Sequence, residues 1–167
     1  MLEIAILTIF PLAMLVSAGM DILTMTIPNK VTLALVAGFF ILAPFIGLGW
    51  TELAIHIALA FGLLLIGMFM FAMGWIGGGD AKLFAATGLW LGYSMQMFEY
   101  ALYASLMGGV LTLLILKLRS LPVVPRFMSF KWMLRLHDPN EGVPYGVALA
   151  ASAMVIYPHS IWFTRIA

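Results

Sequence analysis

The stretch LAIHIALAFGLLLIGMFMFAMGWIGGGD, residues 53–80, decides the fold class of this protein. Its first 22 residues, 53–74, contain a single ionisable side chain, His56. A helix needs about 20 predominantly apolar residues to cross the hydrocarbon core of a bilayer, so this segment is long enough. A run of glycines and Asp80 follow a few residues later. The stretch therefore predicts a membrane-spanning helix that ends close to a carboxylate.

The remainder of the 167-residue chain has the same apolar character. Hydrophobic residues make up 64% of the whole chain and charged residues 9%, which leaves too little polar surface to cover a soluble globule. Apolar segments can be marked out at residues 4–20, 31–50, 53–74, 81–95, 97–117 and 145–163. We therefore expect an all-α polytopic membrane protein, with about six transmembrane helices in a single domain over residues 1–167.

Basic residues lie almost entirely in one set of alternate loops. Seven of the eight fall on one side of the six predicted spans: Lys30, Lys82, Lys117, Arg119, Arg126, Lys131 and Arg135. Because basic loops remain in the cytoplasm, this side is predicted to be cytoplasmic and both termini to be outside. The same count places Asp21 and Asp80 together on the cytoplasmic side. The first segment is expected to be retained, since a signal peptide begins with positive charges and the only early charge here is Glu3.

Other site chemistries find little support. The chain has no cysteine, which excludes disulfides, thiolate metal sites and cysteine nucleophiles. The histidines, His56, His137 and His159, fall on different segments and show no metal-ligand spacing. We therefore expect no metal and no cofactor, and we expect the histidines to serve packing or the membrane interface.

Asp21 and Asp80 are the candidate catalytic residues. A carboxylate costs about 2.5–3.5 kcal/mol to insert at the centre of a membrane helix, so one at the edge of an apolar segment indicates function. Two carboxylates that face each other closely hold one proton between them, because like charges repel in a poorly solvated site. The ionised member can take a proton from water while the protonated member hydrogen-bonds a carbonyl oxygen. The pair therefore predicts peptide-bond hydrolysis without a covalent intermediate.

The glycines before Asp80 are candidate substrate-binding residues. Gly77, Gly78 and Gly79 place no side chain between their backbone and a visiting peptide, which could pair there in extended form. Gly88 and Gly92 lie four residues apart, a spacing that favours close packing of helices.

Three further residues are assigned to substrate binding. Pro28 and Asn29 form the turn after the first segment, and the Asn29 side chain is expected to cap a helix that begins near Lys30. A helical hairpin would need such a turn in any case. Lys82 is expected either to anchor the protein at lipid headgroups or to position substrate. The long polar connection 118–143 predicts either a short helix on the inner leaflet or an ordinary loop. Its apolar face would contain Phe127, Phe130, Met133 and Leu134.

Residues 21–29, 77–83 and 144–148 together resemble the type IV prepilin peptidases, aspartate proteases with a Gly-x-Gly-Asp motif. The length and the last block are most similar to the small enzymes that serve tight-adherence (Flp-type) pili. The resemblance implies that Asp21 and Asp80 are the catalytic aspartates. The implied substrate is a prepilin or pseudopilin precursor with a short basic leader and an apolar helix, cleaved after a glycine.

The resemblance also implies a place and partners for the protein. The site would lie at the cytoplasmic face of a prokaryotic cytoplasmic (inner) membrane, with lipids and the pilus assembly machinery as partners. No nucleic acid is expected, and the oligomeric state stays open. Longer family members carry a cytoplasmic insertion, often with paired cysteines, and methylate the new N-terminus. Methylation is not expected of this chain, which has neither feature.

Two other functions remain open at this level. A small proton- or cation-coupled transporter could use Asp21 and Asp80 as an ion relay, although no internal repeat of the kind common in transporters is found. A non-catalytic subunit of a secretion system would explain the helices but neither the aspartates nor the triple glycine.

Overall fold

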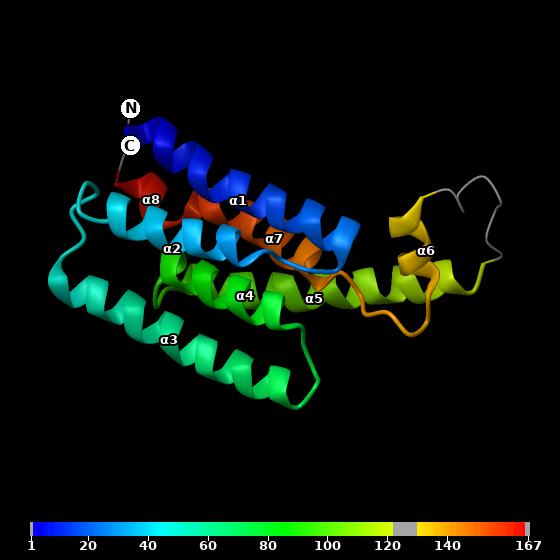
Figure 1. Cartoon of the computed structure of the whole chain (residues 1–167). Coiled ribbons are helices and arrows are strands. Elements are labelled where there is room, and N and C mark those ends of the chain that lie inside the picture. The colour runs from blue at the N-terminus through cyan, green and yellow to red at the C-terminus, as the bar shows by residue number, and fades with distance from the viewer. Residues whose placement is uncertain (1, 122–129, 166–167) are drawn as a thin grey trace.

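The structure, a computed structural model, describes residues 2–121 and 130–165, and every regular element within them is helical (Figure 1). Four helical segments in these ranges are long and apolar enough to cross a membrane. They are α1 (Leu2–Thr24), α3 (Trp50–Ala72), α5 (Met95–Arg119) and the segment Tyr145–Thr164. The last comprises α7 (Tyr145–Ile156), the 3-10 turn η2 (Tyr157–His159) and α8 (Ile161–Thr164). The expectation of an all-α polytopic membrane protein is confirmed.

Two helices are shorter than their predicted segments. α2 (Asn29–Leu42) and α4 (Gly78–Leu91) have 14 residues each, or about 21 Å at 1.5 Å per residue. The segment predicted at 31–50 is wrong at its end, because Pro44 and the positive φ of 71° at Gly47 follow the last helical turn. The segment predicted at 81–95 begins too late, so that Asp80 lies inside the first turn of α4 rather than before the helix.

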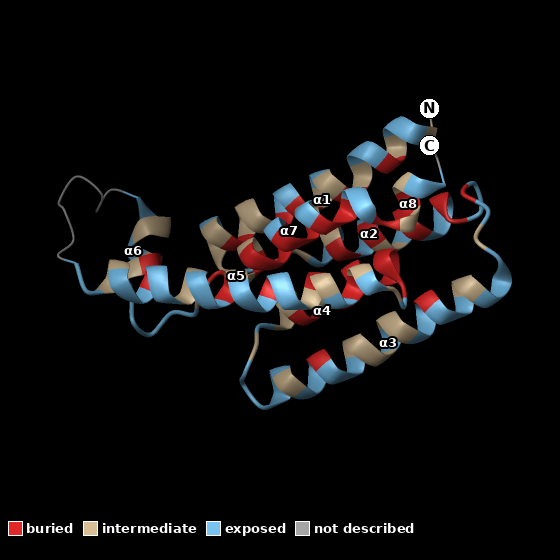
Figure 2. Ribbon diagram, turned by 180° about the vertical axis from the view of Figure 1, so that it is seen from behind, coloured by how far each residue is buried: buried red, intermediate tan, exposed pale blue. Residues whose placement is uncertain are grey.

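Buried residues concentrate in α4 and α7 and on the faces of α1 and α2 that meet them (Figure 2). Trp90 is at the centre of this core: its indole Nε1 donates to the Leu35 carbonyl at 3.0 Å, and its own carbonyl accepts from Trp162 Nε1 at 2.7 Å. The Tyr157 hydroxyl donates to the Ile6 carbonyl at 2.9 Å. Because their polar groups are paired, Trp90, Trp162 and Tyr157 are buried in the core without an unsatisfied donor.

Helix α3 lies on the outside and packs mainly against α4. Gly67 allows this approach, since a Cβ there would lie 2.8 Å from the Ala81 Cβ. Gly88 and Gly92 face Leu63 and the His56 ring with no room for a side chain, which confirms the prediction that they serve packing. His56 Nδ1 lies 2.7 Å from the Leu89 carbonyl oxygen, so this histidine fastens α3 to α4.

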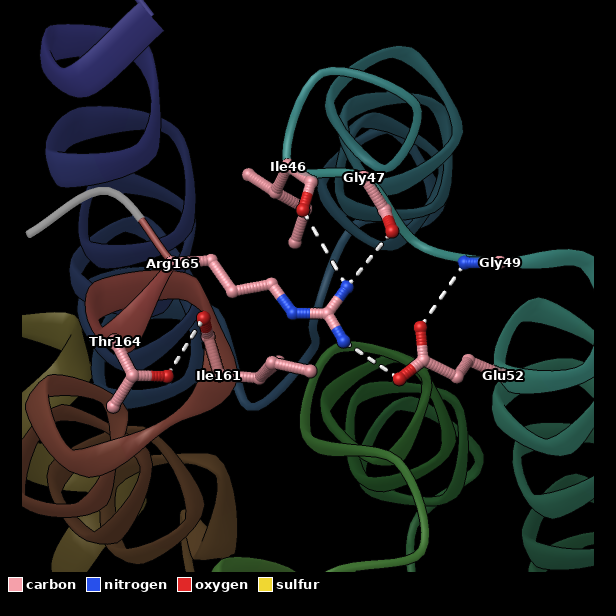
Figure 3. Close-up of polar contacts among 7 residues, drawn as sticks. All are labelled: Ile46, Gly47, Gly49, Glu52, Ile161, Thr164 and Arg165. Atoms are coloured by element: carbon pink, nitrogen blue, oxygen red, sulfur yellow. Dashed lines mark hydrogen bonds and ion pairs between the residues drawn. The ribbon is translucent and has the colours of Figure 1, made fainter.

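Arg165 closes the end of the molecule where both termini lie (Figures 1 and 3). Its Nη2 pairs with Glu52 Oε1 at 2.6 Å, and its Nη1 donates to the Gly47 carbonyl at 3.0 Å. Glu52 Oε2 in turn accepts from the Gly49 backbone N–H at 3.0 Å, at the start of α3. These contacts tie the last helix to the α2–α3 connection.

Candidate active site

Asp21 lies in the last turn of α1 and is 5% exposed. Its Oδ2 accepts a hydrogen bond of 2.7 Å from the backbone N–H of Gly146, the second residue of α7. The first N–H groups of a helix have no partner within the helix, and the positive end of the helix dipole favours a carboxylate there. A Cβ at Gly146 would lie only 2.8 Å from Asp21 Oδ2. Glycine at this position therefore lets α7 bind the carboxylate directly.

Asp80 lies in the first turn of α4, which begins after the N-cap residue Gly77. Its Oδ2 faces Gly77, where a Cβ would lie 2.8 Å away. Its Oδ1 is buried and finds no hydrogen-bond partner among residues 2–121 and 130–165. Buried polar atoms are normally paired, because leaving one unpaired costs about 1–3 kcal/mol. This buried oxygen is thus free to bind a group from outside the described residues.

The two carboxylates lie at the same end of the bundle. The end of α1 and the starts of α4 and α7 come together at the end of the bundle opposite the termini (Figure 1). Ile27 lies against both Gly79, next to Asp80, and Gly146, which binds Asp21. Within the described ranges, no group of three His, Asp or Glu residues that could hold a metal ion includes either aspartate. The site can therefore bind and exchange a proton through its two carboxylates.

The three glycines before Asp80 do not share one role. Gly78 lines a groove and packs near the Phe71 ring, 3.3 Å from where a Cβ would lie. Gly79 is covered by Ile27, whose backbone N would lie 3.2 Å from a Cβ there. Gly77 faces the Asp80 carboxylate itself. Of the three glycines, only Gly78 lines the groove.

Asn29 and Lys82 interact with each other and not with the carboxylates. Lys82 Nζ donates to Asn29 Oδ1 at 2.9 Å. The expectation that Asn29 caps the second helix is wrong: α2 begins at Asn29 itself, after Pro28, and no side chain caps it. Two residues along a helix turn the side chain by about 200°, which places Lys82 on the face of α4 away from Asp80.

A groove of about 700 Å³ runs between α2, α3 and α4 and contains Asn29 and Lys82. Its remaining wall is almost entirely apolar, with side chains such as Leu33, Val36 and Phe61. The polar residues lie at the starts of α2 and α4, and Gly78 lies there too. The groove therefore joins an apolar surface to the end of the molecule that carries the aspartates.

The connection in front of α7 is held by Arg119, at the end of α5. Arg119 Nε donates to the Leu136 carbonyl, and Nη2 donates to the carbonyls of Glu141 and Gly142, all at 2.9 Å. The Tyr145 hydroxyl also binds the α5 backbone, at the Ala104 carbonyl 3.0 Å away. Both contacts fix the start of α7, and with it the N–H that binds Asp21.

The helix expected in the 118–143 connection is present as α6 (Lys131–His137). Part of its expected apolar face, Phe127, lies outside the described residues. Leu136 is the buried residue of α6, whereas Leu134 is exposed. Phe130, the N-cap residue of α6, and Leu134 are exposed while Leu136 packs inward, and the placement of the expected apolar face on the membrane stays a prediction.

Residues 8–113 match the type IV leader peptidase family. The match covers well over half of the chain and includes both aspartates, and the chain therefore belongs to this family of membrane proteases. The block 144–148, which supplies the N–H that binds Asp21, lies beyond the matched range. No curated protein and no solved structure matches the chain.

Proposed function

We propose that this protein is an aspartic endopeptidase that removes the leader from prepilin-like precursors, with Asp21 and Asp80 as its catalytic residues. The observation that carries the proposal is the buried, unpartnered Asp80 Oδ1 beside a second carboxylate, in a chain of the type IV leader peptidase family. An oxygen in this position can donate to, or accept from, a reacting group without first breaking a bond to the protein.

The two carboxylates share one proton, because like charges at close range do not both stay ionised. Asp21 already accepts the Gly146 N–H, a bond that an ionised carboxylate makes most strongly, so Asp21 is the base. It takes a proton from water as the water oxygen bonds to the scissile carbonyl carbon, and Asp80 gives its proton to the carbonyl oxygen. Asp21 then protonates the leaving nitrogen, the C–N bond breaks, and a hydroxyl proton of the intermediate returns to Asp80.

The groove between α2, α3 and α4 accounts for the apolar part of the substrate. Its wall is apolar along most of its length and polar at Asn29 and Lys82, near the aspartates. An apolar helix entering from the lipid would bury its side chains against this wall, as helices do in the grooves of other proteins. The peptide leaving that helix would pass Gly78, the glycine of the run that lines the groove.

The charges at the two ends of the bundle support a cytoplasmic site. Lys82, Arg119 and Arg135 lie at the end with the aspartates, and Arg165 lies at the end with the termini. By the positive-inside rule the aspartates face the cytoplasm and both described ends of the chain face outward. The protein would then be a multi-pass protein of a prokaryotic cytoplasmic membrane that meets its precursor, lipids and the pilus assembly machinery there.

Co-expression with candidate pilin precursors tests the proposal. The wild-type protein should convert a precursor to the mature size, with a new N-terminus at one position in mass spectrometry. Asp80→Asn, expressed at the same level in the membrane, should leave the precursor uncut. Uncut precursor with the wild-type protein and every candidate would refute the peptidase and leave the ion-coupled transporter as the better explanation of the two aspartates.

A further inference from the structure

The Asp21 side chain and one oxygen of the Asp80 carboxylate are covered in this structure. Asp21 is 5% exposed, and Asp80 Oδ1 is buried. If the proposed function is correct, a peptide bond and a water molecule must both reach these oxygens. Some part of the protein must therefore move before the reaction.

Ile27 is the side chain that bridges the starts of α4 and α7. Its Cβ would lie 3.1 Å from a Cβ at Gly79, next to Asp80 in the chain. Its Cδ1 would lie 2.8 Å from a Cβ at Gly146, the residue that binds Asp21. Ile27 is itself 7% exposed. It therefore fills the space between the glycines that adjoin each aspartate.

Ile27 belongs to a short connection and not to a helix. Most of the buried apolar core lies on helices, as Leu35 does on α2, whereas Ile27 lies in the four residues Met25–Pro28 between α1 and α2. Met25 has a φ of 54°, the one positive φ of a non-glycine residue in the described chain. A long side chain rarely adopts this conformation, and such strain is characteristic of segments that switch.

We propose that the Met25–Pro28 connection is a lid over the two aspartates, and that the Ile27 side chain occupies a substrate subsite between Gly79 and Gly146. The subsite takes an extended peptide whose side chain is no larger than that of isoleucine, since glycines form both walls. Rotation about the strained Met25 lifts Ile27 out, and the peptide then lies against Gly79 with its scissile bond between the carboxylates.

Chemical modification of the aspartates tests the lid without reference to cleavage. The full chain in detergent is treated with a water-soluble carbodiimide and an amine, and modification at Asp21 and Asp80 is followed by mass spectrometry. Ile27→Ala should raise both modification rates at least about tenfold over wild type, because the cover is removed. Leu35→Ala deletes a fully buried side chain of the same core and should leave the rates unchanged. Ile27→Val should give a smaller rise, and it serves as the folded variant if Ile27→Ala is poorly expressed.

Unchanged modification in both Ile27 variants would overturn the lid, as would an equal rise in Leu35→Ala. The outcome is separable from that of the peptidase proposal. Faster modification in Ile27→Ala, with no precursor cut by the wild-type protein, would support the lid and refute the peptidase. Cleavage by the wild-type protein, with no effect of Ile27 on modification, would refute the lid alone.

Opening can be measured directly once cleavage of a synthetic precursor segment has been established. The natural sequence has no cysteine, so Ile27→Cys introduces the only thiol. Thr26→Cys, one residue away on the exposed side of the connection, is the matched control. In an Asp80→Asn background, adding the segment should speed maleimide labelling of Ile27→Cys at least about tenfold and leave Thr26→Cys unchanged. No acceleration at residue 27 would overturn the lid.

Discussion

Replacing Gly146 by alanine tests the link between α7 and the site. The new Cβ would lie 2.8 Å from both Asp21 Oδ2 and Ile27 Cδ1, and 3.1 Å from Asp21 Cγ. Ordinary van der Waals contacts are about 3.5–4.0 Å, so the carboxylate must retreat by several tenths of an ångström or more. The hydrogen bond from the Gly146 N–H, 2.7 Å in the native protein, would then lengthen or break.

The expected loss in stability follows from three contributions. A hydrogen bond to a charged group is worth about 1.5–3 kcal/mol, and overpacking a filled site costs about 1–3 kcal/mol. Replacing glycine by alanine in a helix returns about 0.5–1 kcal/mol. The net destabilisation is therefore about 2–5 kcal/mol. The cleavage rate should fall by more than the loss of stability alone would cause, because misplacing a catalytic group by about 1 Å can reduce the rate about 100-fold.

The assay compares precursor cleavage and thermal unfolding in detergent for Gly146→Ala and for Gly109→Ala. Gly109 is the matched control, because it is also a helical glycine and a Cβ there would meet nothing within 4 Å. Gly109→Ala should cleave at the wild-type rate. Wild-type cleavage by Gly146→Ala would refute the reasoning, since Asp21 would then not depend on the close approach of α7.

Three further predictions concern the groove, the contacts of Arg119 with the connection before α7, and the topology. Gly78→Val should slow cleavage with little loss of thermal stability, because its side chain enters the groove, whereas Gly79→Val should lose both through collision with the lid backbone. Arg119→Ala should lower cleavage per folded molecule in a gel assay, and Arg119→Lys should not restore it, because an ammonium group cannot reach all three carbonyls as the guanidinium does. Reporter fusions after Lys82 should read cytoplasmic and fusions at Gly49 external; an external reading at Lys82 would contradict the proposed orientation.

The fold class could be predicted from the sequence for a simple physical reason, whereas the meeting of the two aspartates stays a prediction. Long apolar runs have few alternatives to membrane helices, and the basic residues place Asp21 and Asp80 on one side. Helix ends were harder to predict. α2 ends at Leu42 although apolar residues continue to Ile46, because Pro44 and the positive φ of Gly47 interrupt the helical backbone. Hydropathy measures the polarity of side chains and does not reflect such backbone constraints.

The contacts that build the site depend on pairs far apart in the chain. Gly146 lies 125 residues after Asp21, and nothing in its local sequence shows that its N–H binds a carboxylate. Ile27 looks like any apolar residue before a proline, and only the fold reveals that it lies between two glycines. Asparagine is a common N-cap residue, but the Asn29 side chain accepts a hydrogen bond from Lys82 and does not cap α2. These contacts depend on residues that are distant in the sequence, and local sequence patterns carry no information about them.

The central claim is that Asp21 and Asp80 act as one catalytic pair, and the most direct measurement is precursor cleavage by purified single and double asparagine variants. Asp21→Asn and Asp80→Asn keep the shape of each side chain and remove its ability to exchange a proton. Each should abolish cleavage at normal membrane levels, and the double variant should be no worse than either, because groups that act as a unit are not additive. Substantial cleavage by either purified single variant would contradict the account.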